Sequence, residues 1–216
     1  MTAIDPKFFR RLDEAEDERF YLDPRFVVHI DETAIRTISG ILAAKLGACE
    51  AILDLMSSWR SHLPDSIGPS RVVGLGMNRA ELADNPALSE IVVHNLNREP
   101  RLPFGDGEFD AVLLTVSVQY LIRPIEVFAE VGRVLKAHGP FVVSFSNRMF
   151  PTKAVALWVQ ASEEQRLVLV ARYFHEAGCF EKIEVMQGAQ NRERRSDPVH
   201  CVIGYRRHDE DLRRDA

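Results

Sequence analysis

The stretch Ala51-Ile52-Leu53-Asp54-Leu55-Met56-Ser57-Ser58-Trp59 decides the fold of this chain. Its apolar run contains one carboxylate, Asp54, and then gives way to two hydroxyl side chains. A short apolar run followed by small polar residues is typical of a buried parallel strand that opens into a loop. In open α/β sheets, ligands bind beyond the carboxyl ends of the strands, near the place where the strand order reverses. We therefore expect residues 54–59 to form the floor of a binding site.

The composition is that of a globular protein with a substantial core. The chain has 216 residues, of which 46% are hydrophobic and 27% charged, as in one domain of ordinary size. Its net charge of −5 provides no basic field for nucleic acid or anionic lipid, and we expect neither partner. The N-terminus has no apolar signal-peptide core, and no apolar run approaches the ~20 residues that span a bilayer. We expect a cytoplasmic protein.

Several common kinds of site have no motif here. Cys49, Cys179 and Cys201 are odd in number and widely spaced, which argues against a disulfide framework. His175 and Cys179 are four residues apart, but two such ligands without partners make a poor zinc site, and we expect no metal. The absence of G-x-S-x-G, H-E-x-x-H and G-x-x-x-x-G-K-S/T motifs disfavours α/β-hydrolases, zinc proteases and P-loop proteins.

Two segments precede the first strand. Residues 1–28 mix charges with aromatic side chains and are too aromatic for a disordered tail, so we expect an arm packed on the main body. Asp31 can cap a helix whose apolar positions recur at helical spacing and which stops at Gly47. Residues 1–50 are thus expected to form an arm and a helical lid that cover the site and exclude water.

Apolar runs alternate with helical patterns in the rest of the chain. Prolines and glycines in residues 59–70 allow only a turn or two of helix. Helices are expected after Asn78, with Glu81 as the reciprocal half of a capping box, from Pro124, and after Ser162. Further strands are expected at 71–76, 90–94, 109–116, 141–145, 180–186 and 199–205.

This order of elements predicts an α/β fold, a Rossmann-like doubly wound sheet of seven strands. About a dozen residues join the last two strands, too few for a parallel crossover with its own helix. We therefore expect the last strand to be antiparallel. The chain is expected to be a single domain, with an α/β core at 51–208 and a mobile charged tail at 209–216.

Two motifs flank the fourth strand and the helix after it. They are Leu102-Pro103-Phe104-Gly105-Asp106-Gly107-Glu108-Phe109-Asp110 and Arg133-Val134-Leu135-Lys136-Ala137-His138-Gly139. They resemble the L-P-F-x-D-x-x-F-D and R-V-L-K-P-G-G motifs of the class I S-adenosylmethionine-dependent methyltransferases, in particular those with the type-11 methyltransferase domain. The resemblance runs from residue 52 to 185. It implies S-adenosylmethionine as cofactor and methyl transfer to a small-molecule acceptor.

The resemblance also implies which residues hold the methionine end of the cofactor. In the loop after the first strand they are Asp54, Leu55, Met56, Ser57 and Ser58. The family has a Gly-rich D-x-G-x-G-x-G turn there, in which glycines let the backbone approach the ligand. In this chain Ser57 and Ser58 are expected to donate hydroxyl or backbone bonds to the methionine carboxylate. A short helix from Trp59 is expected to add its N-terminal dipole.

Residues after the second and third strands are expected to contact the adenosine. They are Gly74, Gly76, Met77, Asn78, Asn95 and Leu96. Gly76 aligns with the family's acidic residue that accepts both ribose hydroxyls, and Asn78 offers a weaker acceptor nearby. The alternative for Asn78 is the helix cap described above. Asn95 aligns with the family's adenine-facing acid, and Leu96 can cover the ring.

Residues after the fourth and fifth strands are expected near the reacting groups. Thr115, Val116 and Tyr120 align with the segment under the methionine moiety, where an aromatic face attracts the sulfonium. The alternative for Tyr120 is a core tyrosine with a bonded hydroxyl. Candidates on the acceptor side are Trp59, Ser146, Asn147 and Arg148. No His, Asp or Glu of this region stands out as a catalytic base.

Three functions are weighed on these residues. The first is methyl transfer, which needs a nucleophile and a methyl group held in line. The missing glycines and ribose carboxylate motivate the second, a methyltransferase-like fold without turnover that serves as a ligand-binding or interaction module. The third is an NAD-dependent oxidoreductase, suggested by Gly74-Leu75-Gly76 but lacking the third glycine of a dinucleotide fingerprint. The sequence favours the first.

Overall fold

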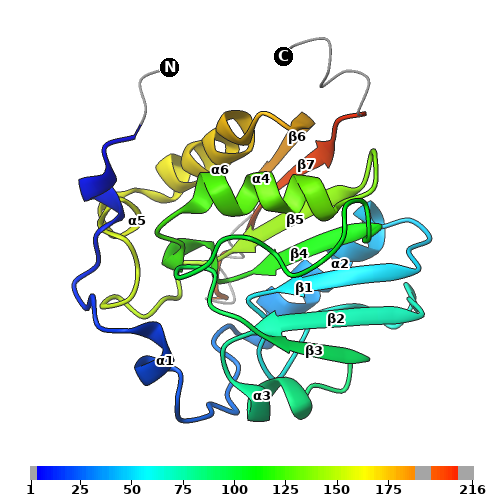
Figure 1. Ribbon diagram of the computed structural model, residues 1–216, viewed down its shortest axis with the longest axis horizontal. Helices are drawn as coiled ribbons and strands as arrows, with labels where there is room; N and C mark the ends of the chain where they lie inside the picture. The colour runs from blue at the N-terminus through cyan, green and yellow to red at the C-terminus, as the bar shows by residue number, and fades with distance from the viewer. Residues whose placement is uncertain (1–3, 188–195, 209–216) are drawn as a thin grey trace.

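A seven-stranded sheet in the order β3-β2-β1-β4-β5-β7-β6 forms the centre of the molecule (Figure 1). The computed structural model describes residues 4–187 and 196–208, so the predicted charged tail lies outside the described residues. The strands are β1 Ala51–Leu55, β2 Arg71–Gly76, β3 Glu90–Val93, β4 Ala111–Thr115, β5 Pro140–Phe145, β6 Phe180–Gln187 and β7 His200–Arg206. Strand β7 is antiparallel to β5 and β6, and the other neighbours are parallel. The predicted fold is confirmed.

The strand order reverses between β1 and β4. From β1 the chain moves outward to β2 and β3, then returns to the other side of β1 with β4 and β5. Asp54 lies beside Gly74 of β2 and Leu113 of β4 in the register of the sheet. The carboxyl ends of β1, β2 and β4 therefore meet at one edge, on both sides of the reversal.

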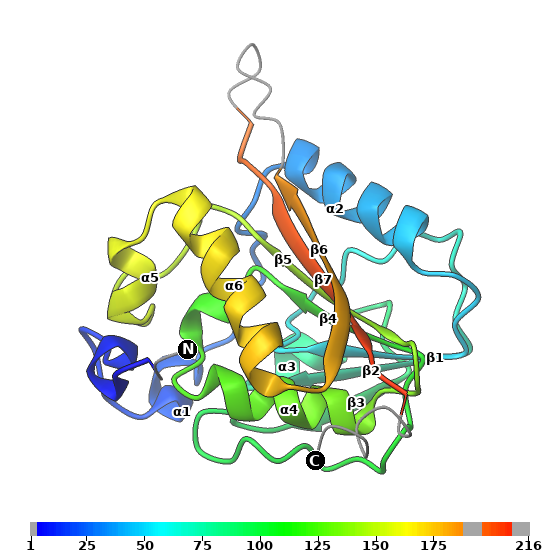
Figure 2. The ribbon, with the colours of Figure 1, turned by 90° about the horizontal axis from the view of Figure 1, so that it is seen from above.

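Helices cover the two faces of the sheet unequally. They are α1 Asp17–Phe20, α2 Glu32–Lys45, α3 Arg79–Ala83, α4 Pro124–Val134, α5 Ala156–Gln160 and α6 Glu163–Ala177, with 3-10 turns at Pro6–Phe9 and Val118–Tyr120. Figure 2 shows α2 on one face and α4 and α6 on the other. Because successive strand residues point to opposite faces, Phe141 and Val143 pack beneath α4 and α6, whereas Val142 packs beneath α2.

Predicted caps set the helix ends. The Asp31 side chain accepts a hydrogen bond from the Ala34 amide at 2.8 Å at the start of α2. Helix α6 begins with the capping box of Ser162 and Gln165 and ends at Gly178, whose φ of 72° is left-handed. Since a left-handed residue suits glycine best, the helix stops there.

Two local predictions are wrong. Residues 57–70 contain a turn at 65–67 but no helix, so no helix dipole follows Trp59. Pro64, Pro69 and Gly68, whose φ is 51°, interrupt any helical run. Asn78 does cap α3, but the Glu81 carboxylate is not the other half of a capping box, because it bonds to Arg25 and Ser58 instead.

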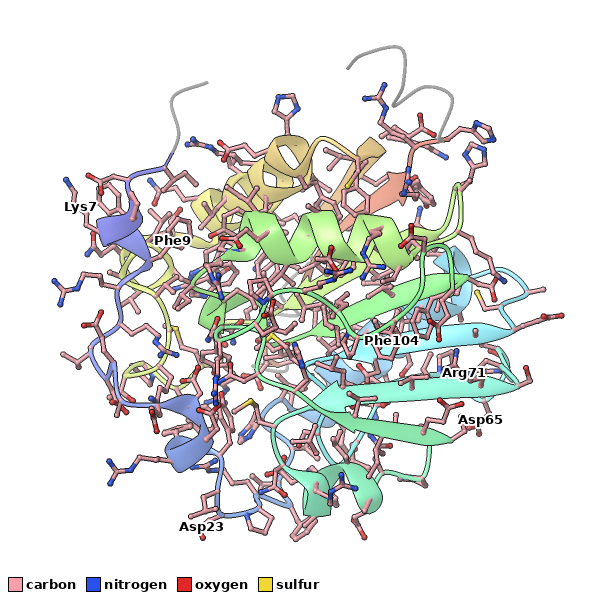
Figure 3. The ribbon with its side chains drawn as sticks, viewed as in Figure 1. Lys7, Phe9, Asp23, Asp65, Arg71 and Phe104 are labelled. Carbon is pink, nitrogen blue, oxygen red and sulfur yellow. The ribbon has the colours of Figure 1, made fainter. Side chains whose placement is uncertain are left out.

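The N-terminal arm, residues 4–30, lies along the edge where the parallel strands end. Figure 3 labels Phe9 and Asp23 of the arm at one edge of the molecule and Arg71, the first residue of β2, at the opposite edge. Arg71 pairs there with Glu90 at 2.7 Å and Glu108 at 2.8 Å. No helix in the described residues is long and apolar enough to cross a membrane.

Candidate functional site

A cavity of ≈ 390 Å³ opens at the edge where β1, β2, β3 and β4 end. This volume lies in the range of small-molecule sites, about 300–1,000 Å³. Its walls come from the loops after these four strands, from the arm, and from residues 148–150 after β5. The cavity thus lies at the reversal of strand order, where the sequence predicts a site.

Most predicted site residues line this cavity. They are Asp54, Met56, Ser57, Ser58, Trp59, Met77, Asn78, Asn95, Leu96, Thr115, Val116, Tyr120 and Arg148. Those that do not line it are Leu55, Gly74, Gly76, Ser146 and Asn147. Leu55 and Ser146 are buried away from it, and Asn147 is exposed.

Gly74 and Gly76 serve the packing of the chain. A Cβ on Gly74 would lie 2.2 Å from the Leu88 side chain, and one on Gly76 would lie 2.2 Å from the Ser57 carbonyl oxygen. The Ser57 amide also donates to the Leu75 carbonyl at 2.8 Å. Gly76 therefore gives the loop after β1 room to cross the end of β2, and it does not face a ligand.

Left-handed residues begin the loops after both strands of the reversal. Met56 follows β1 with φ of 55°, and Val116 follows β4 with φ of 50°. Both line the cavity. This conformation is uncommon for side chains other than glycine and is unfavourable for a β-branched one. Met56 thus adopts a left-handed backbone conformation that normally favours glycine.

Asp54 is a buried carboxylate in the floor of the cavity. It is 5% exposed, and its Oδ2 accepts hydrogen bonds from the hydroxyls of Ser57, at 2.6 Å, and Ser61. Burial raises the pKa of Asp54, and the two serine hydrogen bonds oppose that shift. Among the described residues, no cationic side chain pairs with it.

Glu81 is a second buried carboxylate, which the sequence analysis missed. It is 7% exposed and lines the cavity. Its Oε2 accepts from the Ser58 hydroxyl at 2.6 Å and its Oε1 from the Arg25 amide at 2.7 Å. The hydroxyl hydrogens of Ser57 and Ser58 are therefore donated to protein carboxylates and not, as predicted, to a ligand carboxylate.

Asn78 attaches the arm to the end of β2. Its side-chain oxygen accepts from the amides of Ala80 and Glu81, which caps α3. Its Nδ2 donates to the carbonyls of Tyr21 at 2.9 Å and Leu22 at 3.1 Å. All four hydrogen-bonding positions of the amide are used. The helix-cap interpretation is confirmed, and no capacity remains for the predicted ribose contact.

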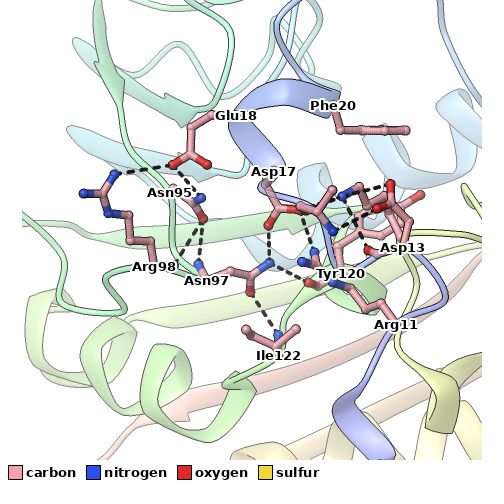
Figure 4. A network of polar contacts seen from close by, with 12 residues as sticks. Arg11, Asp13, Asp17, Glu18, Phe20, Asn95, Asn97, Arg98, Tyr120 and Ile122 are labelled. Atoms are coloured by element: carbon pink, nitrogen blue, oxygen red, sulfur yellow. Dashed lines mark hydrogen bonds and ion pairs between the residues drawn. The ribbon is translucent and has the colours of Figure 1, made fainter.

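Asn95 and its neighbour Asn97 hold the arm at the end of β3 (Figure 4). Asn95 Nδ2 donates to Glu18 Oε1 at 2.9 Å, and its oxygen accepts from the Asn97 amide. Asn97 Nδ2 donates to Asp17 Oδ2, also at 2.9 Å. The Asp17 carboxylate in turn pairs with Arg11 at 2.6 Å in a buried contact. The Asn95 side chain thus bonds to Glu18 of α1, whereas we expected it to contact the adenine of the cofactor.

The two predicted aromatic contacts differ in their surroundings. Tyr120 lines the cavity, and its hydroxyl accepts from the Phe150 amide at 2.8 Å. Burial raises the pKa of Tyr120, so its phenol stays neutral at pH 7. Trp59 donates its Nε1–H to the Val27 carbonyl at 2.9 Å and packs edge-on against Phe26. Trp59 therefore anchors the arm.

The cavity wall also contains His29, His62 and His94, none of which was predicted as a site residue. His29 comes from the arm and His62 from the irregular segment after β1. Burial lowers the pKa of both imidazoles, with Arg25 adding to the shift of His29. Both rings are therefore neutral at pH 7. Only tertiary contacts bring them to the site, so no local pattern could reveal them.

The cover of the cavity differs from the predicted one. Arm residues between 11 and 30 line it, but no residue of α2 does. Buried Ala34, Ile38 and Leu42 of α2 pack on the sheet instead. Within the described residues, no three His, Cys, Asp or Glu side chains gather as metal ligands.

The fold is that of the class I methyltransferases, and the cavity lies at the reversal of strand order. Residues 61–143 match the family model of the methyltransferase domain. No curated protein matches the chain. The predicted resemblance is confirmed: the chain has the class I methyltransferase fold and carries a segment of this domain.

Solved methyltransferase structures share this fold at low sequence identity. The 1,6-didemethyltoxoflavin-N1-methyltransferase of Burkholderia thailandensis, with bound S-adenosylhomocysteine, is 17% identical over 82% of this chain and 80% of its own, with a TM-score of 0.59. A possible histamine N-methyltransferase of Thermotoga maritima is 13% identical over 81% and 90%, with a TM-score of 0.59. A putative methyltransferase of Haloferax volcanii, in complex with the Trm112 activator, is 17% identical over 82% and 92%, with a TM-score of 0.60. These comparisons support the predicted cofactor, S-adenosylmethionine.

Proposed function

We propose that this protein is a cytoplasmic enzyme that transfers the methyl group of S-adenosylmethionine to a small-molecule acceptor. One observation carries the proposal: Asp54 and Glu81 are buried in the wall of one cavity, and neither has a cationic partner among the described residues. Buried charges are normally paired. S-adenosylmethionine carries an ammonium and a sulfonium, so its charge suits this wall.

The residues present fit the cofactor, although not in the family's usual pattern. Glu81 supplies a carboxylate near the end of β2 that Gly76 lacks. Each carboxylate oxygen has a second lone pair beyond the one used inside the protein, so Glu81 can accept the ribose hydroxyls. Asp54 and the oxygens of Ser57 and Ser58 can accept from the ammonium group. With these assignments, the nucleoside of the cofactor lies against α3 and its methionine part lies over β1.

The protein's task in such a reaction is mainly positional. When bound, S-adenosylmethionine would supply a methyl carbon activated by its sulfonium, and the thioether would be the leaving group. Tyr120 presents a neutral ring at the cavity, where an aromatic face stabilises a nearby cation. The arm covers the site and limits water. His29 and His62 are neutral cavity-lining bases able to take a proton from an acceptor.

The charge and the cysteines suit the proposed setting. The net charge of −5 favours a small acceptor over nucleic acid. The three cysteines are free, as is usual in a reducing compartment.

Isothermal titration calorimetry with S-adenosylmethionine and S-adenosylhomocysteine tests the proposal. We expect binding heat with both ligands and a sharp loss of affinity in Asp54→Ala. Asp65→Ala, at an exposed position outside the cavity, is the matched control and should bind as the wild type does. If neither ligand gives binding heat, the proposed methyltransferase activity is ruled out. If Asp54→Ala binds as tightly as the wild type, the cofactor does not bind at Asp54.

A second candidate function follows from the two asparagines. Asn78 and Asn95 hold the arm instead of facing a nucleoside, which favours a module that binds another ligand without turnover. Thermal denaturation with and without S-adenosylhomocysteine separates the two functions. A cofactor-binding enzyme is stabilised by its ligand through mass action, whereas the melting temperature of a module for an unrelated ligand does not change.

A further inference from the structure

Arg25 differs from the other cationic side chains of the cavity wall. Among the described lining residues, Arg11 pairs with Asp17, Arg60 with Asp84 and Arg148 with Asp197. Arg25 lines the same cavity and forms no ion pair with a described residue. It therefore brings a positive charge to the site that the protein itself does not neutralise.

The Arg25 guanidinium is held in place but incompletely bonded. Its Nη2 donates to the Phe20 carbonyl at 2.8 Å, and the Arg25 backbone amide donates to Glu81. Its Nη1 is buried and has no hydrogen-bond partner. A buried donor without an acceptor is unfavourable, and more so when it is charged. An oriented charge with an unused donor is what an incoming anion requires.

The surroundings of Arg25 are aromatic. Its Cζ lies 4.5 Å from the ring centroid of Phe20 and 5.6 Å from that of Phe150. The Phe150 ring contacts His29 at 5.0 Å and lies 6.1 Å from Tyr120. We call these five residues, Phe20, Arg25, His29, Tyr120 and Phe150, the aromatic corner. Aromatic rings favour planar aromatic partners through stacked and edge-on contacts.

The aromatic corner also lies on the side where an acceptor is expected. Phe150 belongs to the segment after β5, which the sequence analysis assigns to the acceptor. Asp54 and Glu81, the carboxylates assigned to the cofactor, belong to β1 and α3 instead. The unpaired carboxylates of the cavity thus come from β1 and α3, whereas the unpaired guanidinium of Arg25 comes from the arm.

We propose that the aromatic corner binds the methyl acceptor and that this acceptor is an aromatic carboxylate, with Arg25 as the residue that selects its acidic group. The inference rests on the proposed function and deepens it. A guanidinium recognises a carboxylate through charge-assisted hydrogen bonds, which are about twice as strong as neutral ones. The ring of the acceptor packs against Phe150.

The test compares benzoate and 2-naphthoate with benzamide, a neutral molecule of nearly the same shape as benzoate. Each is titrated at millimolar concentration into the full-length protein saturated with S-adenosylhomocysteine. We expect the acids to bind at least about tenfold more tightly than the amide. Arg25→Met should abolish this preference, and Arg25→Lys, which keeps the charge, should retain part of it. Arg36→Met, at an exposed position of α2, is the matched control and should keep the full preference.

The outcomes separate this proposal from the proposed function. Binding of S-adenosylhomocysteine is measured first, and its absence contradicts the enzyme reaction itself. Failure of the acids to bind, equal binding of acid and amide, or an unchanged preference in both Arg25 variants overturns the acceptor class alone. If the acids bind only when S-adenosylhomocysteine is absent, Arg25 binds the carboxylate of the cofactor, and the proposed acceptor class is also wrong. Melting temperatures establish that each variant is folded.

Discussion

The Glu81 carboxylate accepts a hydrogen bond from the Ser58 hydroxyl at 2.6 Å, which joins the first turn of α3 to the loop after β1. The same carboxylate accepts from the Arg25 amide of the arm. Three segments that are distant in sequence therefore meet at one buried charge. This position between the strand ends is the reason why we propose Glu81, and not the residue at Gly76, as the acceptor for the ribose hydroxyls.

Replacement of Glu81 tests that role. Glu81→Gln keeps the shape of the side chain but removes the charge that strengthens hydrogen bonds from ribose hydroxyls. Because a hydrogen bond to a charged group contributes about 1.5–3 kcal/mol, we expect an affinity for S-adenosylhomocysteine about 10- to 100-fold lower. Calorimetry measures the change, with exposed Glu126→Gln in α4 as the control. Equal affinities in the two variants would show that Glu81 only holds the arm.

The attachment of the arm can be measured through its buried ion pair. Asp17 and Arg11 are 6% and 8% exposed, and Lys153, 3.5 Å from Asp17, is 1% exposed. Asp17→Asn leaves the buried Arg11 side chain without its carboxylate, while Lys153 keeps its pair with Asp13 at 3.2 Å. The loss of the Arg11 partner should lower the free energy of unfolding by about 3–5 kcal/mol. Glu14→Gln breaks the exposed pair with Arg10 and should lower stability much less than Asp17→Asn does, because solvent screens exposed ion pairs. Similar urea midpoints for the two variants would contradict a tightly anchored arm.

The left-handed backbone of Met56 predicts a difference between two truncations. Met56→Gly and Met56→Ala remove nearly the same packing, but only glycine adopts a φ of 55° without strain. We expect the glycine variant to be more stable than the alanine variant by about 1 kcal/mol. Chemical denaturation of both proteins gives this difference directly. An alanine variant of equal or greater stability would mean that the backbone strain at this position is negligible.

The partly buried imidazole of His62 makes stability depend on pH. Burial lowers its pKa from 6.5 in the folded protein, so the unfolded chain takes up the proton at a higher pH than the folded one does. The free energy of unfolding should therefore fall as the pH decreases below about 6.5. Urea denaturation at about pH 7.5 and about pH 5.5 should show a smaller loss in His62→Gln than in the wild type. The exposed His175→Gln serves as control and should lose as much stability as the wild type.

Local patterns were sufficient to predict the fold. The apolar runs around Leu53 and Leu113 form the central parallel strands, and the Ser162–Gln165 capping box starts α6 as expected. The short connection between β6 and β7 was enough to predict the antiparallel strand. Each of these features depends on residues close together in the chain, which is why sequence spacing reveals them.

The site could be predicted only in part, because its contacts join distant segments. The spacing of Asn78 and Glu81 fits a capping box. Glu81 instead bonds to Arg25 and Ser58, which lie 56 and 23 positions away from it in the sequence. Asn78 and Asn95 were placed at the cavity, as predicted, but they bond to the arm. The pattern of apolar runs located the strand ends, and only the folded chain showed which groups occupy the space between them.

A crystal structure of the protein with S-adenosylhomocysteine tests the central claim most directly. The account predicts ligand density over Asp54 to Ser58, with the ribose hydroxyls within hydrogen-bond distance of the Glu81 carboxylate and the arm closed above. A structure obtained at saturating ligand in which that cavity holds no nucleoside, or in which arm side chains fill it, would contradict the account.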